Sequence, residues 1–164
     1  WFTIAHFVAH GVATAGNRMT LFVFYEWLTV STYPLVTHSC TTAAKRSGRI
    51  YLGLLLGTSI GLQLVAIVWT WFATGTLDFR EGGIIDGHLQ GAAVGLLLLL
   101  YMYGIGKAAL MPIHRWLPEA MVAPTPVSAL LHAVAVVKAG VFTVLKVIVY
   151  IFGAEVLREA GTGA

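Results

Sequence analysis

Long apolar runs with very few charges occupy most of this 164-residue sequence. About 20 apolar residues are enough for a helix to cross the hydrocarbon core of a bilayer. Inside lipid the backbone has no water to bond, so such runs favour helices, which satisfy their own N–H and C=O groups. The sequence therefore predicts an all-α fold, a polytopic transmembrane helical bundle.

The composition favours the same fold class and excludes other kinds of protein. Hydrophobic residues make up 58% of the chain and charged residues 10%, whereas soluble proteins carry about 25% charged residues. The basic residues are dispersed, so the net charge of +3 does not indicate nucleic acid as a partner. With only Cys40, an internal disulfide is excluded. His6 and His10 are four residues apart, but no neighbour completes a ligand set, so we expect no metal and no other cofactor.

The apolar runs divide the chain into about four full spans and one partial span, which we treat as a single transmembrane domain over residues 1–164. The partial span covers about 1–15, and the full spans cover about 18–38, 50–74, 89–111 and 124–153. The apolar start at Trp1 and the small, polar tail are typical of a fragment of a longer protein, cut inside a membrane helix.

A basic cluster predicts the orientation of these spans. Lys45, Arg46 and Arg49 lie in the connection 39–49 between the second and third spans. Basic residues gather in cytoplasmic loops of membrane proteins. We therefore expect an integral membrane protein, of a bacterial inner membrane, with loop 39–49 in the cytoplasm.

Prolines interrupt the fourth span. Pro removes a helical hydrogen bond and disfavours helix in the residue before it. We expect a helix to about Ala109, a break near Met111–Pro112, a short amphipathic helix over 113–121 and a new span from Pro126. Broken helices at membrane depth usually line a cavity or an ion path.

Three ionisable residues lie deep in apolar runs, namely Glu26, Lys107 and Lys138. An ionisable group within a membrane span is costly and marks a functional site by default. Each has a plainer interpretation. Glu26 is either a proton-exchanging carboxylate or a neutral acid held by a hydroxyl of Thr29 or Ser31. Lys107 either works inside the membrane or extends its chain to the interface, which Lys138 is too deep to reach.

Further candidates flank these residues. His132 is either a proton relay beside Lys138 or a core histidine bonded to a carbonyl. Lys146 is nearer a membrane face, where extension to the interface is favoured. The short amphipathic piece carries His114, Arg115 and Trp116. Interfacial anchoring is favoured for Trp116, with a lipid or quinone site at Arg115 and Trp116 as an alternative.

Two stretches are similar to a known family. GIGKAALMPIHRWLPEAMVAPTPVSALLHAVAVVKAGVF (104–142) resembles the most recognisable segment of the antiporter-like membrane subunits of respiratory complex I, membrane-bound hydrogenases and Mrp-type cation/proton antiporters. GNRMTLFVFYEWLTVSTYPLV (16–36) resembles the glutamate-bearing helix of the same family. The match corresponds to one five-helix repeat of such a subunit.

The resemblance implies proton translocation through a buried relay of Glu26, Lys107, His132 and Lys138, with water-filled half-channels on either side. Accessory candidates are Lys146, His114, Trp116 and Arg115. The subunit would have no redox chemistry of its own, and its partners would be other membrane subunits, the bilayer, H⁺ and either Na⁺ or K⁺.

Three readings of the function stay open. The ending VVKAGVF favours an Mrp-type antiporter subunit or a related complex. The alternative is a proton-pumping subunit of complex I (NADH:quinone oxidoreductase) or of a membrane-bound hydrogenase. A third reading, of a different class, is a non-conducting structural scaffold whose buried charges are static.

Overall fold

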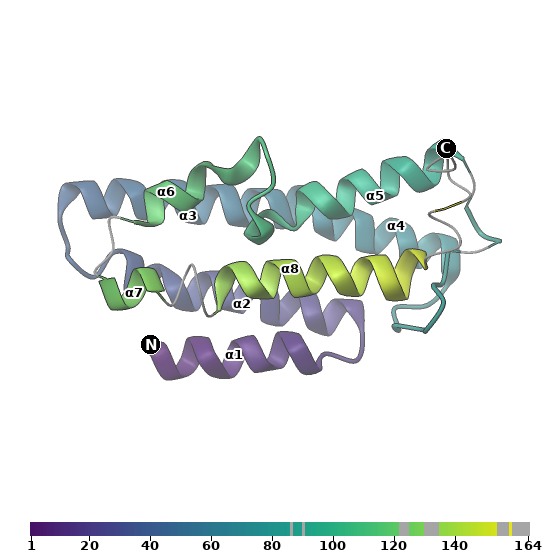
Figure 1. The fold of residues 1–164 in the computed structure, drawn as a ribbon, viewed down its shortest axis with the longest axis horizontal. Coiled ribbons are helices and arrows are strands. Elements are labelled where there is room, and N and C mark those ends of the chain that lie inside the picture. The colour runs from purple at the N-terminus through teal and green to yellow at the C-terminus, as the bar shows by residue number, and fades with distance from the viewer. Residues whose placement is uncertain (86, 90, 122–124, 130–134, 154–157, 159–164) are drawn as a thin grey trace.

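The computed structural model describes residues 1–85, 87–89, 91–121, 125–129, 135–153 and 158 (Figure 1). Over this part of the chain the regular structure is helical, with one isolated β-bridge between Asn17 and Asp78. The all-α prediction is confirmed. The helices are α1 (Phe2–Thr14), α2 (Arg18–Val36), α3 (Thr42–Thr58), η1 (Ser59–Gln63), α4 (Leu64–Thr74), α5 (Ala92–Gly104), η2 (Gly106–Ala108), η3 (Ile113–Arg115), α6 (Trp116–Ala120), α7 (Thr125–Ala129), α8 (Val136–Val147) and η5 (Ile148–Phe152).

The longest helix runs from Thr42 to Thr74 and joins α3, the π-helical turn η1 and α4. Its 33 residues extend about 50 Å, more than the thickness of the hydrocarbon core. Of the helices in the described ranges, this is the one long and apolar enough to cross a membrane by length and composition, while α1 and α5 are shorter apolar helices. The expected number of spans stays a prediction.

The basic cluster differs from our expectation. We placed Lys45, Arg46 and Arg49 in a connection over 39–49, but α3 begins at Thr42 and its first turns include all three residues. The Thr41 side chain accepts a hydrogen bond from the Ala44 backbone N–H at 3.1 Å. This cap starts the helix early because it satisfies an amide that the first turn leaves unpaired.

The fourth apolar run is folded as two helical pieces against the long helix. α5 packs on η1 and α4, and α6 packs on α3, with the break between them (Figure 1). α5 ends at Gly104, earlier than the expected end near Ala109. Ala109 has a positive φ of 54°, which a continuing right-handed helix cannot contain. Because α5 ends at Gly104, the break begins before Lys107, and this lysine lies in the short turn η2.

Helix α8 (Val136–Val147) lies in the middle of the helical bundle. α8 contacts α1, α2, α5 and the turn η2, and it continues as the π-helical turn η5 to Phe152. We expected one span over about 124–153. α7 and α8 lie within it, residues 130–134 between them lie outside the described part, and the single span stays a prediction.

The surface carries many large apolar side chains. Phe7 is 63% exposed, Phe72 is 75% exposed and Met111 is 77% exposed. A soluble monomer rarely leaves so much apolar surface uncovered. The surface therefore fits contact with lipid or with further protein.

Candidate functional site

Lys107 lies at the centre of the candidate site and is fully buried. Its ammonium donates a hydrogen bond to the Tyr25 backbone oxygen at 2.5 Å and lies 3.2 Å from the centroid of the Tyr25 ring. Its backbone N–H donates to the Tyr25 hydroxyl at 3.1 Å. An ammonium over an aromatic ring is stabilised by the negative face of the ring, most strongly away from water. The side chain therefore points into the protein rather than toward an interface.

Small residues let the Lys107 segment pack closely against its neighbours. A Cβ added at Gly140 of α8 would lie 2.4 Å from the Ala108 backbone nitrogen and 2.5 Å from the Lys107 carbonyl carbon. One added at Gly106 would lie 2.5 Å from Thr58 Oγ1 of α3. At Gly140 no side chain fits, because backbone approaches so closely, and at Gly106 a side chain would displace that of Thr58. The two glycines therefore allow η2 to sit between α3 and α8.

Trp116 covers the same turn from α6. It is fully buried, and its indole N–H donates to the Gly106 carbonyl at 2.9 Å. Its ring also packs edge-on against Tyr51 of α3, with centroids 5.7 Å apart. Our expectation of interfacial anchoring is wrong for Trp116, and its burial also leaves it unavailable to lipid or quinone. The prolines that break the fourth run fold α6 back onto α3 and turn the indole inward.

Glu26 follows Tyr25 on α2 and is half-buried. Both of its carboxylate oxygens are buried and have no hydrogen-bond partner among the described residues. The hydroxyl groups of Thr29 and Ser31, which we considered as partners, donate instead to the backbone oxygens of Tyr25 and Leu28. A buried carboxylate without hydrogen-bond donors is energetically costly. Either a bound proton that neutralises it or a water molecule that donates to it lowers this cost.

The carboxylate of Glu26 also makes no hydrogen bond to the ammonium of Lys107, since neither oxygen has a partner in the described ranges. The two residues are nevertheless linked through α2. Tyr25 of α2 binds the ammonium of Lys107, and Glu26 is the next residue of the same helix. The carboxylate is therefore available for a mobile partner, whereas the ammonium is already held by Tyr25.

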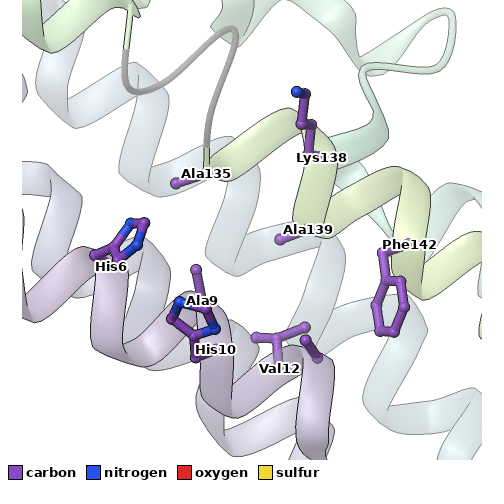
Figure 2. A pocket seen from close by; sticks show the side chains of 9 residues that line it. His6, Ala9, His10, Val12, Ala135, Lys138, Ala139 and Phe142 are labelled. Atoms are coloured by element: carbon purple, nitrogen blue, oxygen red, sulfur yellow. The ribbon is translucent and has the colours of Figure 1, made fainter.

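Lys138 is in a different environment, on the exposed side of α8. It lines a groove of about 240 Å³ between α1 and α8, together with His6, His10, Ala135 and Phe142 (Figure 2). The rings of His6 and His10 are 4.9 Å apart and edge-on. In Figure 2 the lysine side chain extends away from both rings. The structure therefore does not bring Lys138 into the enclosed Lys107 cluster.

Lys146 binds a helix end rather than reaching toward an interface. Its ammonium donates to the Ala15 carbonyl at 2.7 Å and, more weakly, to the Ala13 carbonyl at 3.4 Å. Carbonyls at the end of a helix lack helical partners, and a cation there is favourable. The interaction ties α8 to the end of α1.

The remaining candidates are less well defined. Arg115 is exposed, and His114 Nδ1 is buried without a hydrogen-bond partner in the part of the chain described. His132 lies outside the described residues. Across the same residues, no group of three or more His, Cys, Asp or Glu side chains is placed to hold a metal ion.

Two residues that shape the site carry little signal in the sequence. Tyr25 holds Lys107 through its carbonyl, its hydroxyl and its ring. A tyrosine inside an apolar run, next to an acidic residue, was the available signal. Gly140 had a weaker signal, since it is a glycine within a helix close to an intramembrane lysine, and only the packing identifies its neighbour.

Comparisons with known proteins identify relatives of this chain. The family model described as NADH:quinone oxidoreductase/Mrp antiporter, TM, matches residues 15–159. NAD(P)H-quinone oxidoreductase chain 5 of Synechocystis is 34% identical over 83% of this chain and 21% of its own length. The putative antiporter subunit mnhA2 of Staphylococcus saprophyticus is 33% identical over 83% of this chain and 17% of its own length.

The chloroplastic NAD(P)H-quinone oxidoreductase subunit 5 of Ipomoea purpurea is 33% identical over 84% of this chain and 20% of its own length. The chain thus spans about a fifth of the length of these curated relatives. The family match covers α2 with Glu26, the break with Lys107 and α8 with Lys138. The chain therefore belongs to the NADH:quinone oxidoreductase/Mrp antiporter transmembrane family.

Proposed function

We propose that this chain forms a proton-conducting part of a membrane subunit in a multisubunit Mrp-type cation/proton antiporter or a related complex. The observation that carries the proposal is a fully buried lysine held by Tyr25, followed on α2 by Glu26, whose buried carboxylate oxygens have no partner among the described residues. Titratable groups inside a membrane protein mark proton and ion pathways. The proposal places the protein in an inner membrane, with the basic first turns of α3 on the cytoplasmic side.

In this mechanism a proton reaches Lys107 and passes by way of His132 toward Lys138. Glu26 sets the proton affinity of the lysine through its charge, because Lys107 in η2 is held by Tyr25, the residue before Glu26 on α2. The Tyr25 carbonyl and ring hold the ammonium in the loaded state. Deprotonation weakens both interactions and frees the amine. No covalent step is required.

The relay needs water at two places. The Glu26 oxygens require donors, and the exposed Lys138 opens on the groove lined by His6 and His10. Water molecules at these positions would connect the enclosed Lys107 to the open side of α8. The driving energy would come from a partner subunit or from Na⁺ or K⁺ moving the opposite way.

The test is proton flux into vesicles that contain the full-length protein in its complex. We expect Lys107→Met and Glu26→Gln to abolish flux while assembly stays intact. Lys45→Met is the matched control, because Lys45 is exposed on the first turns of α3 and far from the relay in sequence. Flux equal to that of the wild type in the double variant Glu26→Gln/Lys107→Met would reject conduction and leave the structural scaffold.

The same vesicles separate the antiporter from the redox-linked alternative. Proton flux that depends on Na⁺ or K⁺ on the opposite side supports an antiporter. Flux that is independent of both cations and follows quinone reduction in the complex instead supports a proton-pumping subunit of an oxidoreductase.

A further inference from the structure

A second buried charge lies away from the proposed relay. Arg18 is the first residue of α2 and is only 2% exposed. Its Nε donates to the Leu77 carbonyl at 3.2 Å, and its Nη2 donates to the Thr76 carbonyl. The third nitrogen, Nη1, is buried and has no hydrogen-bond partner among the described residues. A buried charged donor left unpaired is strongly destabilising, so Nη1 requires a partner.

Gln63 presents a matching acceptor. It is the last residue of the π-helical turn η1, in the middle of the long helix, and is 1% exposed. Its side-chain oxygen Oε1 is also buried without a partner within the described ranges. The turn cannot shift toward α5, because Gly104 already packs so closely that an added Cβ would lie 2.4 Å from the Gln63 nitrogen.

Arg18 and Gln63 line the same small cavity of about 10 Å³. Tyr101 of α5 and Thr143 of α8 contribute hydroxyl groups to its wall, and the other lining residues are apolar. A cavity needs about 10–15 Å³ of accessible space to hold a water molecule, so this one is just large enough for a single water. The cavity is therefore lined by an unpaired donor, Arg18 Nη1, and an unpaired acceptor, Gln63 Oε1. It has space for one small molecule that can both accept and donate a hydrogen bond.

We propose that this cavity binds one water molecule, which accepts a hydrogen bond from Arg18 Nη1 and donates one to Gln63 Oε1. Buried waters typically make about three hydrogen bonds, and the hydroxyl oxygens of Tyr101 and Thr143 supply further acceptors. The water solvates the guanidinium inside the bundle. It also connects the start of α2 with the π-helical turn, whose last residue contacts the helix that leads to Lys107.

The proposal can be tested by mapping water in the full-length protein in its complex. Ionising radiation in ¹⁸O-labelled water converts bound waters into hydroxyl radicals, which modify adjacent side chains even when these are buried. We expect Tyr101 to be modified several-fold faster than Tyr51. Tyr51 is the matched reference, since it is equally buried but does not line the cavity. Its hydroxyl is paired with Thr32 at 2.7 Å, as the Tyr101 hydroxyl is with Thr70 at 2.9 Å. Equal rates for the two tyrosines would overturn the proposal.

A density map that resolves ordered water gives the direct answer. We expect one peak within about 2.7–3.2 Å of both Arg18 Nη1 and Gln63 Oε1 in the wild type. The variant Gln63→Leu should lose this peak and bring the labelling of Tyr101 down to that of Tyr51. An empty cavity in the wild type, or a direct bond between Arg18 and Gln63, would contradict the proposal. The wild-type map decides the matter if the variant does not fold.

Discussion

The two lysines that the sequence presents as equivalent occupy opposite environments. Lys107 is enclosed by α2, α3, α6 and α8, and its ammonium is held by the Tyr25 carbonyl and ring. Lys138 is exposed beside a groove that also contains His6 and His10 (Figure 2). One lysine is therefore surrounded by fixed partners, and the other is open to whatever fills the groove.

This difference fits the two positions of the proposed relay. A loading site benefits from a protein environment that holds the ammonium in one place and excludes bulk water, as the Lys107 cluster does. A site that passes protons onward benefits from access to water or to another titratable group. The comparison predicts large stability effects around Lys107 and small ones around Lys138.

The largest effect should come from Trp116, which covers the Lys107 turn. We expect Trp116→Ala to lower the free energy of unfolding by about 3–5 kcal/mol, because it removes a fully buried side chain together with its hydrogen bond to the Gly106 carbonyl. Trp71→Ala is the control and should cost about 1 kcal/mol, since Trp71 is 46% exposed. Denaturant unfolding of the purified full-length protein measures both. Similar losses would place Trp116 outside the stable core.

A smaller effect is expected at Gly140, where α8 meets the backbone of Lys107. Gly140→Ala should lower the free energy of unfolding by about 1–3 kcal/mol, because the added Cβ overlaps the Ala108 nitrogen. The same change at Gly95 of α5, where nothing lies within 4 Å of an added Cβ, should raise it by about 0.5–1 kcal/mol. Opposite signs in thermal unfolding would support the packing, whereas a gain at both glycines would contradict it.

The smallest effect is expected at Lys138. We expect Lys138→Gln to change the free energy of unfolding by less than about 0.5 kcal/mol, as for Lys45→Gln, because both side chains are exposed. Thermal unfolding in detergent measures the difference. A loss above about 1 kcal/mol at Lys138 alone would show that another part of the full-length protein encloses it, and the contrast with Lys107 would disappear.

Much of the fold was accessible from the sequence, because it depends on local patterns. The apolar runs predicted helices, and the prolines at 112, 124 and 126 predicted a break followed by a short helix. The positions were less accurate. α5 ends at Gly104 rather than near Ala109, and α3 begins at Thr42 rather than near residue 50. Helix ends depend on caps and on packing against other elements, which hydropathy does not register.

The candidate site was only partly predictable. Glu26 and Lys107 stood out because an ionisable group in an apolar run is rare. Arg18 does not stand out in the sequence, since a charge at the edge of an apolar run is ordinary, yet it is 2% exposed. Its burial follows from the loop carbonyls of Thr76 and Leu77, which reach it from a distant part of the chain.

By itself, the sequence determined the fold class, the break in the fourth apolar run and the family, because these follow from composition, prolines and a long motif. Only the tertiary structure decided which lysine is enclosed, which way Trp116 faces and that Arg18 and Gln63 meet at one cavity. The physical reason is that burial and pairing are properties of several helices together. A single apolar run presents its lysine in the same way whether a neighbouring helix covers it or not.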